Sequence, residues 1–246
     1  YGAALHGFDL LNGSNNLLLD VTPLSLGIET MGGLMEKIIP RNSNIPVVKE
    51  QTFTTNENGQ TSIKISIIQG ERETSSKNTL LGEFILSDIE PKPAGIPRIK
   101  VRFSLDVDGI LFVSAIDESS GNEKNLVIKT NKDLNITEMK KLVESSIKNA
   151  KEDMDTRLLI ESKIKASRLI NEIENVKDQI ETLCTKKDIE NINKTSNMLK
   201  KEMKTNNKER IETLTDNLNE QTKNFAQKLI DKNFKNFVGK DLDILE

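Results

Sequence analysis

Hydrophobic and polar residues alternate with a period of two in the first half of the chain. Along residues 63–67 isoleucine alternates with lysine and serine, and residues 101–107 alternate in the same way. This period puts the apolar side chains on one face of a β-strand. Asp108-Gly109 separates the second run from the apolar residues 111–115, and it predicts a type I′ hairpin turn. Further strands are predicted at Ser25–Thr30, Gln51–Thr55, Gly82–Leu86 and Asn125–Lys129.

The second half of the chain changes to the spacing of three and four that is typical of helices. The apolar stripes are Val143, Ile147, Ala150 and Met154; then Ile173, Val176, Ile180 and Leu183; then Ile211, Leu214, Leu218, Phe225 and Leu229. Each stripe needs a partner surface, and we expect the later ones to pack on one another as a small antiparallel bundle.

Proline and glycine separate the same two halves. All 6 prolines lie at or before Pro97, and Gly239 is the one glycine of 13 beyond Gly121. Because both residues interrupt regular elements and form turns, the first half is turn-rich and the second can run as long helices. The sequence therefore predicts an α+β chain with segregated parts, a β-sandwich followed by helices, with the boundary near Thr130–Asn135.

Composition excludes several classes of function. The net charge of −3 offers no basic surface for nucleic acid, and no apolar run approaches the roughly 20 residues of a membrane helix. The opening residues 1–6 lack a start methionine and a signal-peptide pattern, so we expect the chain to be part of a longer protein.

Candidate catalytic groups are few. His6 is the only histidine, and Cys184 is the only cysteine and lies in a helical stripe beside Leu183. A small buried hydrophobe is the better interpretation of this cysteine. The sequence has no phosphate-binding glycine loop, and Asp106-x-Asp108-Gly109 fits a hairpin better than a calcium loop. We predict no catalytic residue and no metal ligand.

A long ordered string carries the most specific signal. Leu17-Leu18-Leu19-Asp20-Val21 precedes residues 22–33, Thr-Pro-Leu-Ser-Leu-Gly-Ile-Glu-Thr-Met-Gly-Gly. By itself the leucine run could open a buried strand. Together with Ile38–Asn42, Gln69–Arg72 and Asp106–Ala115, however, the string resembles the seventy-kilodalton heat-shock chaperones, the DnaK family. The resemblance covers roughly residues 1–130.

The resemblance implies a domain order. Residues 1–16 would be the end of an ATPase domain, 17–21 (Leu17, Leu18, Leu19, Asp20 and Val21) the interdomain linker, 22–130 a β-sandwich that binds peptide, and 131–246 an α-helical lid. ATP and magnesium would belong to the absent ATPase domain, so this chain would bind peptide without being an enzyme.

The resemblance also implies the residues that bind peptide. Ile28, Met31, Phe53, Ile63 and Ile65 would line the channel, with Asn56 opposite Met31 in an arch over the peptide. A small apolar residue is usual at the position of Asn56, so the amide should alter peptide preference. Any one of these side chains, taken alone, could instead be an ordinary core residue.

Three features resemble the iron–sulfur biogenesis branch, the HscA type. They are Ala94, where general chaperones usually carry an arginine, and the stretches 166–172 and 221–226. The client would then be the iron–sulfur scaffold protein, bound through a Leu-Pro-Pro-Val-Lys segment with a J-domain co-chaperone. The alternatives are a general folding chaperone, a helical dimerisation or adaptor module and, least supported, an enzyme using His6. A bacterial cytoplasmic location is expected, and the mitochondrial matrix stays open.

Overall fold

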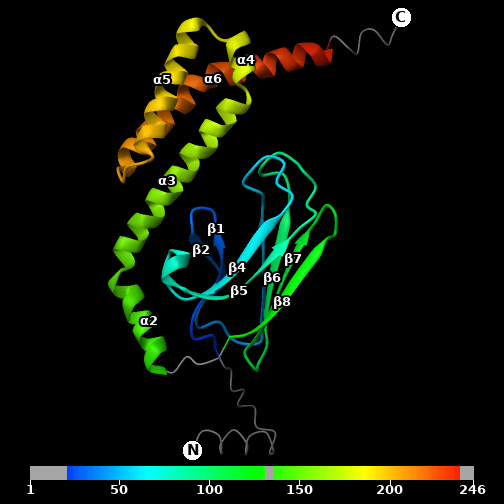
Figure 1. Cartoon of the computed structure of the whole chain (residues 1–246), viewed down its shortest axis with the longest axis vertical. Coiled ribbons are helices and arrows are strands. Elements are labelled where there is room, and N and C mark those ends of the chain that lie inside the picture. The colour runs from blue at the N-terminus through cyan, green and yellow to red at the C-terminus, as the bar shows by residue number, and fades with distance from the viewer. Residues whose placement is uncertain (1–20, 131–135, 239–246) are drawn as a thin grey trace, which may run out of the picture. The chain divides into compact units, whose positions relative to one another are not determined.

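The described part of the chain consists of two antiparallel sheets followed by helices, as the change from a period of two to helical spacing predicts (Figure 1). The computed structural model describes residues 21–130 and 136–238. The chain divides into two compact units, the first ending at Asp153 and the second beginning at Met154. The predicted division into domains at residues 130 and 131 stays a prediction.

Each sheet has four strands. The first has the order β2-β1-β4-β5 and comprises β1 (Leu26–Thr30), β2 (Leu34–Ile39), β4 (Ile63–Gln69) and β5 (Thr79–Leu86). The second has the order β3-β6-β7-β8 and comprises β3 (Val47–Phe53), β6 (Ile99–Leu105), β7 (Ile110–Asp117) and β8 (Glu123–Lys129). A short 3-10 helix, Ser75–Lys77, lies between β4 and β5.

The core of the first unit combines apolar side chains from both sheets. In β4, Ile65 and Ile67 are buried, and in β6 Val101 and Phe103 are buried while Arg102 between them is exposed. The predicted alternation is confirmed in β6 up to Leu105, whereas Val107 lies beyond that strand and is 64% exposed, and in β4 the alternation holds only as far as Ile65. Ser66 and Ile68 are buried as well, so beyond Ile65 both faces of β4 are covered.

Two glycines allow close approaches in this unit. A Cβ atom on Gly27 of β1 would lie 2.1 Å from the carbonyl oxygen of Glu36 in the paired strand β2. A Cβ atom on Gly82 of β5 would lie 2.9 Å from the Cδ2 atom of Leu126 in β8. The first contact is with backbone, which cannot move easily, and the second is with the end of a side chain. An added methyl group is therefore harder to accommodate at Gly27 than at Gly82.

Other details of the strand prediction are also wrong, and the strand predicted at Gln51–Thr55 is β3, which spans Val47–Phe53. Strand β2 was not predicted, because its burial pattern pairs Leu34 with Met35 and Ile38 with Ile39 instead of alternating. The β6–β7 hairpin forms, but its turn is not type I′, since Gly109 has a φ of 73° whereas Asp108 has no positive φ. The Asp106 carboxylate accepts the backbone N–H groups of Asp108 and Ile110 and stabilises a longer turn.

Five helices follow the sandwich in the described part of the chain. They are α2 (Ile136–Lys148), α3 (Ala150–Asn175), α4 (Lys177–Leu183), α5 (Lys186–Glu202) and α6 (Lys208–Val238). The two later stripes pack into one core, in which Ile180, Ile211 and Leu218 are buried, so the predicted bundle is confirmed. Helix α5 adds Ile192 and Leu199, which the stripes did not include. Among the helices described, none is long and apolar enough to cross a bilayer.

The first predicted stripe is wrong as a buried face. Ile147 is 67% exposed and Met154 is 50% exposed. The helix is also interrupted between Lys148 and Ala150, where the side chain of Asn149 donates to the carbonyl oxygen of Ser145 at 2.7 Å. The backbone N–H of Asn149 donates to the same carbonyl oxygen at 3.1 Å, and the N–H of Asp153 donates to the carbonyl oxygen of Asn149 at 2.9 Å, so helical hydrogen bonding nevertheless continues through this boundary.

Candidate functional site

The predicted peptide-binding residues separate into an inner and an outer set. The inner set comprises Ile28, Phe53, Ile63 and Ile65, which all contact the sandwich core. Ile28 and Ile65 are fully buried, whereas Phe53 and Ile63 are half-buried at its border. Strands β1 and β4 are paired with Ile28 opposite Ile67, which brings the two buried isoleucines onto neighbouring strands.

Met31 belongs to the outer set. It follows β1 in the turn to β2 and is half-buried. Gly32 and Gly33 have φ angles of 81° and 73°, and the N–H of Gly33 donates to the carbonyl oxygen of Thr30 at 3.0 Å. Only glycine adopts such angles readily, so these two residues fix the turn that carries the methionine.

Asn56 is the other outer residue and lies in the loop 54–62 between β3 and β4. Its side chain is exposed. The side chain of Gln60 organises the loop, because its Oε1 atom accepts the backbone N–H groups of Asn56 at 3.0 Å and Glu57 at 3.3 Å, while its Nε2 atom donates to Ser62. Thus the inner set belongs to the sandwich core and its border, whereas Met31 and Asn56 lie in two structured loops.

Of the predicted linker, Leu17, Leu18, Leu19 and Asp20 lie outside the described residues. Val21 forms an antiparallel bridge with Asn44. The backbone of the next residue, Thr22, donates to Ser43 at 2.9 Å, and its hydroxyl donates to Pro40 at 3.0 Å. The first described residues are therefore anchored to the β2–β3 connection.

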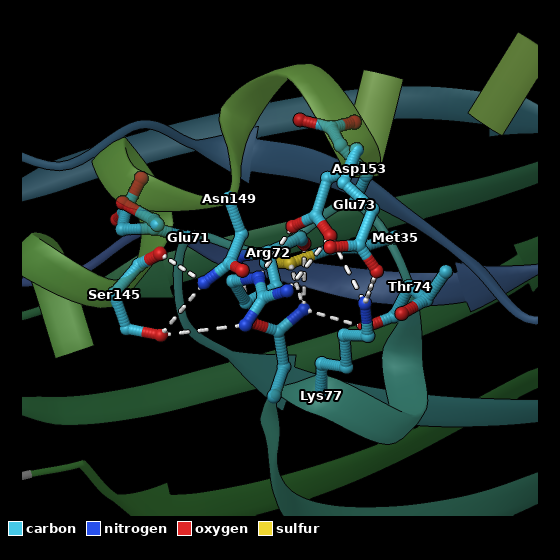
Figure 2. A network of polar contacts seen from close by, with 12 residues as sticks. Met35, Glu71, Arg72, Glu73, Thr74, Lys77, Ser145, Asn149 and Asp153 are labelled. Atoms are coloured by element: carbon cyan, nitrogen blue, oxygen red, sulfur yellow. Dashed lines mark hydrogen bonds and ion pairs between the residues drawn. The ribbon is translucent and has the colours of Figure 1, made fainter. Parts of the chain in front are cut away.

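A polar network in the first unit joins the segment after β4 to the helices (Figure 2). Arg72 forms a two-pronged ion pair with Asp153: its Nε atom donates to Oδ2, and its Nη2 atom donates to Oδ1 at 2.8 Å. Lys77 donates to the same Oδ1 at 3.1 Å, and Arg72 reaches the hydroxyl of Ser145 at 3.3 Å. Asp153 thus ties the first turns of α3 to the β4–β5 connection.

This network perturbs the acid–base properties of its members. The Asp153 side chain is only 3% exposed, yet the hydrogen bonds from Arg72, and then Lys77, lower its pKa from 3.8 to about 2. Asp153 in turn raises the pKa of Arg72. Asp153 also lies in the first turn of α3, where the helix dipole favours a negative charge. The carboxylate is therefore ionised and structurally engaged.

Glu71, beside Arg72, holds the start of β1. Its carboxylate accepts the backbone N–H of Ser25 at 2.7 Å and the hydroxyl of the same residue at 3.2 Å. The Nζ atom of Lys37 lies 3.6 Å from Oε2 of this carboxylate, the oxygen that also accepts the Ser25 hydroxyl. The sequence analysis did not predict either network. The string Gln69–Arg72 was noted only as part of the family resemblance, and no local pattern reveals that Arg72 has a partner 81 residues away.

Of the two residues weighed as catalytic candidates, Cys184 lies within the described part of the chain. Cys184 ends α4, is half-buried against the helical core, and burial raises the pKa of its thiol. It therefore behaves as the small hydrophobe that was predicted. His6 lies outside the described residues.

Comparison with known proteins gives a consistent family. Residues 1–231 match the family described as "Hsp70 protein". The chain is 41% identical over 223 residues to the chaperone protein HscA homolog of Methylococcus capsulatus, covering 91% of this chain and 36% of the relative. It is 41% identical over 228 residues to the chaperone protein DnaK of Mesomycoplasma hyopneumoniae strain 232, covering 92% of this chain and 38% of the relative. The chain therefore spans little more than a third of the length of these relatives.

Proposed function

The chain belongs to the Hsp70 family, and on this premise we propose that it is the peptide-binding part of a chaperone. One observation supports the proposal: Ile28, Phe53, Ile63 and Ile65 come from three strands and belong to or pack against the sandwich core, and Met31 and Asn56 lie in the loops that follow β1 and β3. An extended peptide offers a backbone and a few apolar side chains, so its receptor needs a small apolar pocket with polar edges. Filling such a pocket with one leucine is worth about 1.5–3 kcal/mol.

Fluorescence anisotropy of a labelled leucine-rich peptide tests this proposal. Met31→Ala removes an outer wall without touching the buried core, so we expect binding to weaken by roughly tenfold. Val127→Ala is the matched control, because Val127 is 60% exposed on β8 in the other sheet. Absence of binding by the unaltered chain, or equal losses in the two variants, contradicts the proposal.

The proposed client is the iron–sulfur scaffold protein, recognised through a Leu-Pro-Pro-Val-Lys segment. Support comes from the three features of the sequence that resemble the iron–sulfur branch, including Ala94. Proline also restricts φ, which lowers the entropy lost when an extended segment is bound. The relatives named HscA and DnaK are equally similar at 41%. Sequence identity therefore does not separate a specialised client from general protein folding, and a binding experiment is needed.

That experiment compares the Leu-Pro-Pro-Val-Lys peptide with a leucine-rich peptide of equal length and charge. Preference for the proline-containing peptide supports the specialised client. Equal binding, or preference for the leucine-rich peptide, assigns the chain to general protein folding instead.

Peptide release would be controlled by ATP. The segment 17–21 would couple the peptide site to an ATPase domain that holds ATP and magnesium, with a J-domain co-chaperone stimulating hydrolysis in a bacterial cytoplasm. In the protein that includes this domain, ATP should accelerate peptide release. Replacing Leu17, Leu18 and Leu19 with alanine should abolish that acceleration while leaving ATP-free peptide affinity unchanged.

A further inference from the structure

The loop 54–62, which carries Asn56, rests on a second loop that the peptide-binding prediction did not include. This second loop, residues 89–97, contains Pro91, Pro93 and Pro97. Proline fixes φ and so stiffens the backbone. The loop is held at its start by the buried Ile89, and β6 begins just beyond it at the buried Ile99. It therefore forms a rigid support anchored in the core.

Hydrogen bonds join the two loops at four points within residues 21–130. Three use backbone groups only: Ile89 N–H to Thr61 O at 3.0 Å, Gly59 N–H to Lys92 O at 2.9 Å, and Gly95 N–H to Thr55 O at 3.1 Å. The fourth uses a side chain, since Oδ1 of Asn58 accepts the N–H of Ala94 at 2.9 Å. We call these four bonds the loop brace.

Asn58 can affect the proposed site because it lies in the loop that carries Asn56. It lies at the exposed tip of the loop, two residues from Asn56. Phe53 precedes the loop and Ile63 follows it. A shift of the tip therefore moves an outer wall of the site relative to an inner set that is fixed in the core. Three bonds of the brace use backbone groups that every residue except proline carries, whereas the fourth requires the side chain of Asn58.

We propose that Asn58 is a positioning residue that, through Ala94, holds the loop 54–62 closed and sets the lifetime of a bound peptide. The inference deepens the proposed function and rests on it for the identity of the ligand. An intact brace keeps the loop close to its bound position, so a peptide leaves only when the loop opens. Loss of the bond raises the opening frequency and accelerates dissociation, and it accelerates association as well because peptide enters and leaves through the same opening.

The kinetic experiment uses stopped-flow fluorescence of a labelled leucine-rich peptide with the whole chain. Asn58→Ala should raise the dissociation rate roughly fivefold, the effect of one lost hydrogen bond, and should raise the association rate in the same direction. Asn58→Asp should restore the slow rate, because a carboxylate oxygen can also accept from Ala94. Glu57→Ala is the control, since the neighbouring side chain is exposed and lies outside the brace.

Amide hydrogen exchange of the peptide-free chain tests the brace separately. In Asn58→Ala the amides of Gly59 and Gly95, which keep their own partners, should exchange several-fold faster, and Asn58→Asp should return them to the original rates. Unchanged exchange refutes the brace. Faster exchange with an unchanged dissociation rate refutes the control of peptide lifetime. If the unaltered chain binds no peptide, the proposed function fails and the kinetic role with it, while the exchange data still decide on the brace.

Discussion

Removing the charge of Asp153 should destabilise the first unit in a way that depends on pH. In Asp153→Asn the carboxylate that receives Arg72 and Lys77 becomes neutral. The pKa of Asp153 is lowered from 3.8 to about 2, and one pKa unit corresponds to about 1.4 kcal/mol. The folded state therefore gains roughly 2.5 kcal/mol from the ionised form. Arg72 keeps partial access to water, with 15% of its side chain exposed, so the loss should stay near 2–3 kcal/mol.

The direction of the pH dependence follows from the lowered pKa. The stabilisation is complete above the pKa of the unfolded chain and disappears as the pH falls through the folded-state pKa of about 2. The stability difference between the original chain and Asp153→Asn should therefore shrink to about half of its neutral value at pH 3. The remaining half should vanish on further acidification.

The assay must follow one unit at a time. Urea unfolding read by hydrogen-exchange mass spectrometry of peptides from residues 63–86 reports the first unit, and it suits a chain without tryptophan. Glu83→Gln is the control, because Glu83 pairs with Lys64 in an exposed ion pair worth less than about 1 kcal/mol. Equal losses in the two variants, or a loss for Asp153→Asn that is the same at pH 7 and pH 3, would refute the reasoning.

Three further changes follow from packing. Ile65→Phe should weaken leucine-rich peptide binding at least tenfold by overfilling the pocket, whereas Ile65→Val should change anisotropy titrations little; equal affinities in folded proteins exclude Ile65 from the site. Gly27→Ala should cost about 3 kcal/mol or more and Gly82→Ala about 1 kcal/mol in urea unfolding, since only the first meets backbone; the reverse order would contradict the register. Leu199→Ala should cost about 2–5 kcal/mol in thermal unfolding of the helices, and Met198→Ala, at a 39% exposed neighbour, should cost far less.

Sequence patterns predicted what depends on one face of one element. Alternation along 63–67 gave the buried isoleucines, and helical spacing gave Ile211 and Leu218 of the bundle core. The pattern failed at Leu34–Ile39, where adjacent residues are buried in pairs. It failed again at Ile147, because spacing shows that a stripe exists but not that another surface covers it.

For the candidate site, family resemblance supplied the residues and local patterns did not. Nothing in the spacing distinguishes the buried Ile65 from the equally buried Ile67. The Arg72–Asp153 ion pair depends on how the β4–β5 connection meets α3, which only the folded chain defines. The same holds for the bond between Asn58 and Ala94, which lie 36 residues apart.

The loop brace also bears on how the protein ages. Asn58 is followed by Gly59, and asparagine is chemically labile, most of all before glycine, where the unhindered backbone nitrogen can attack the side-chain amide. Here that nitrogen donates its hydrogen to Lys92, and the amide oxygen is held by Ala94. Both reacting groups are thus restrained from closing the ring. A chain whose loop frays would accumulate isoaspartate at this position, and the added main-chain methylene would prevent the loop from settling back. The hydrogen bonds that shape the loop therefore also slow the chemical degradation of Asn58.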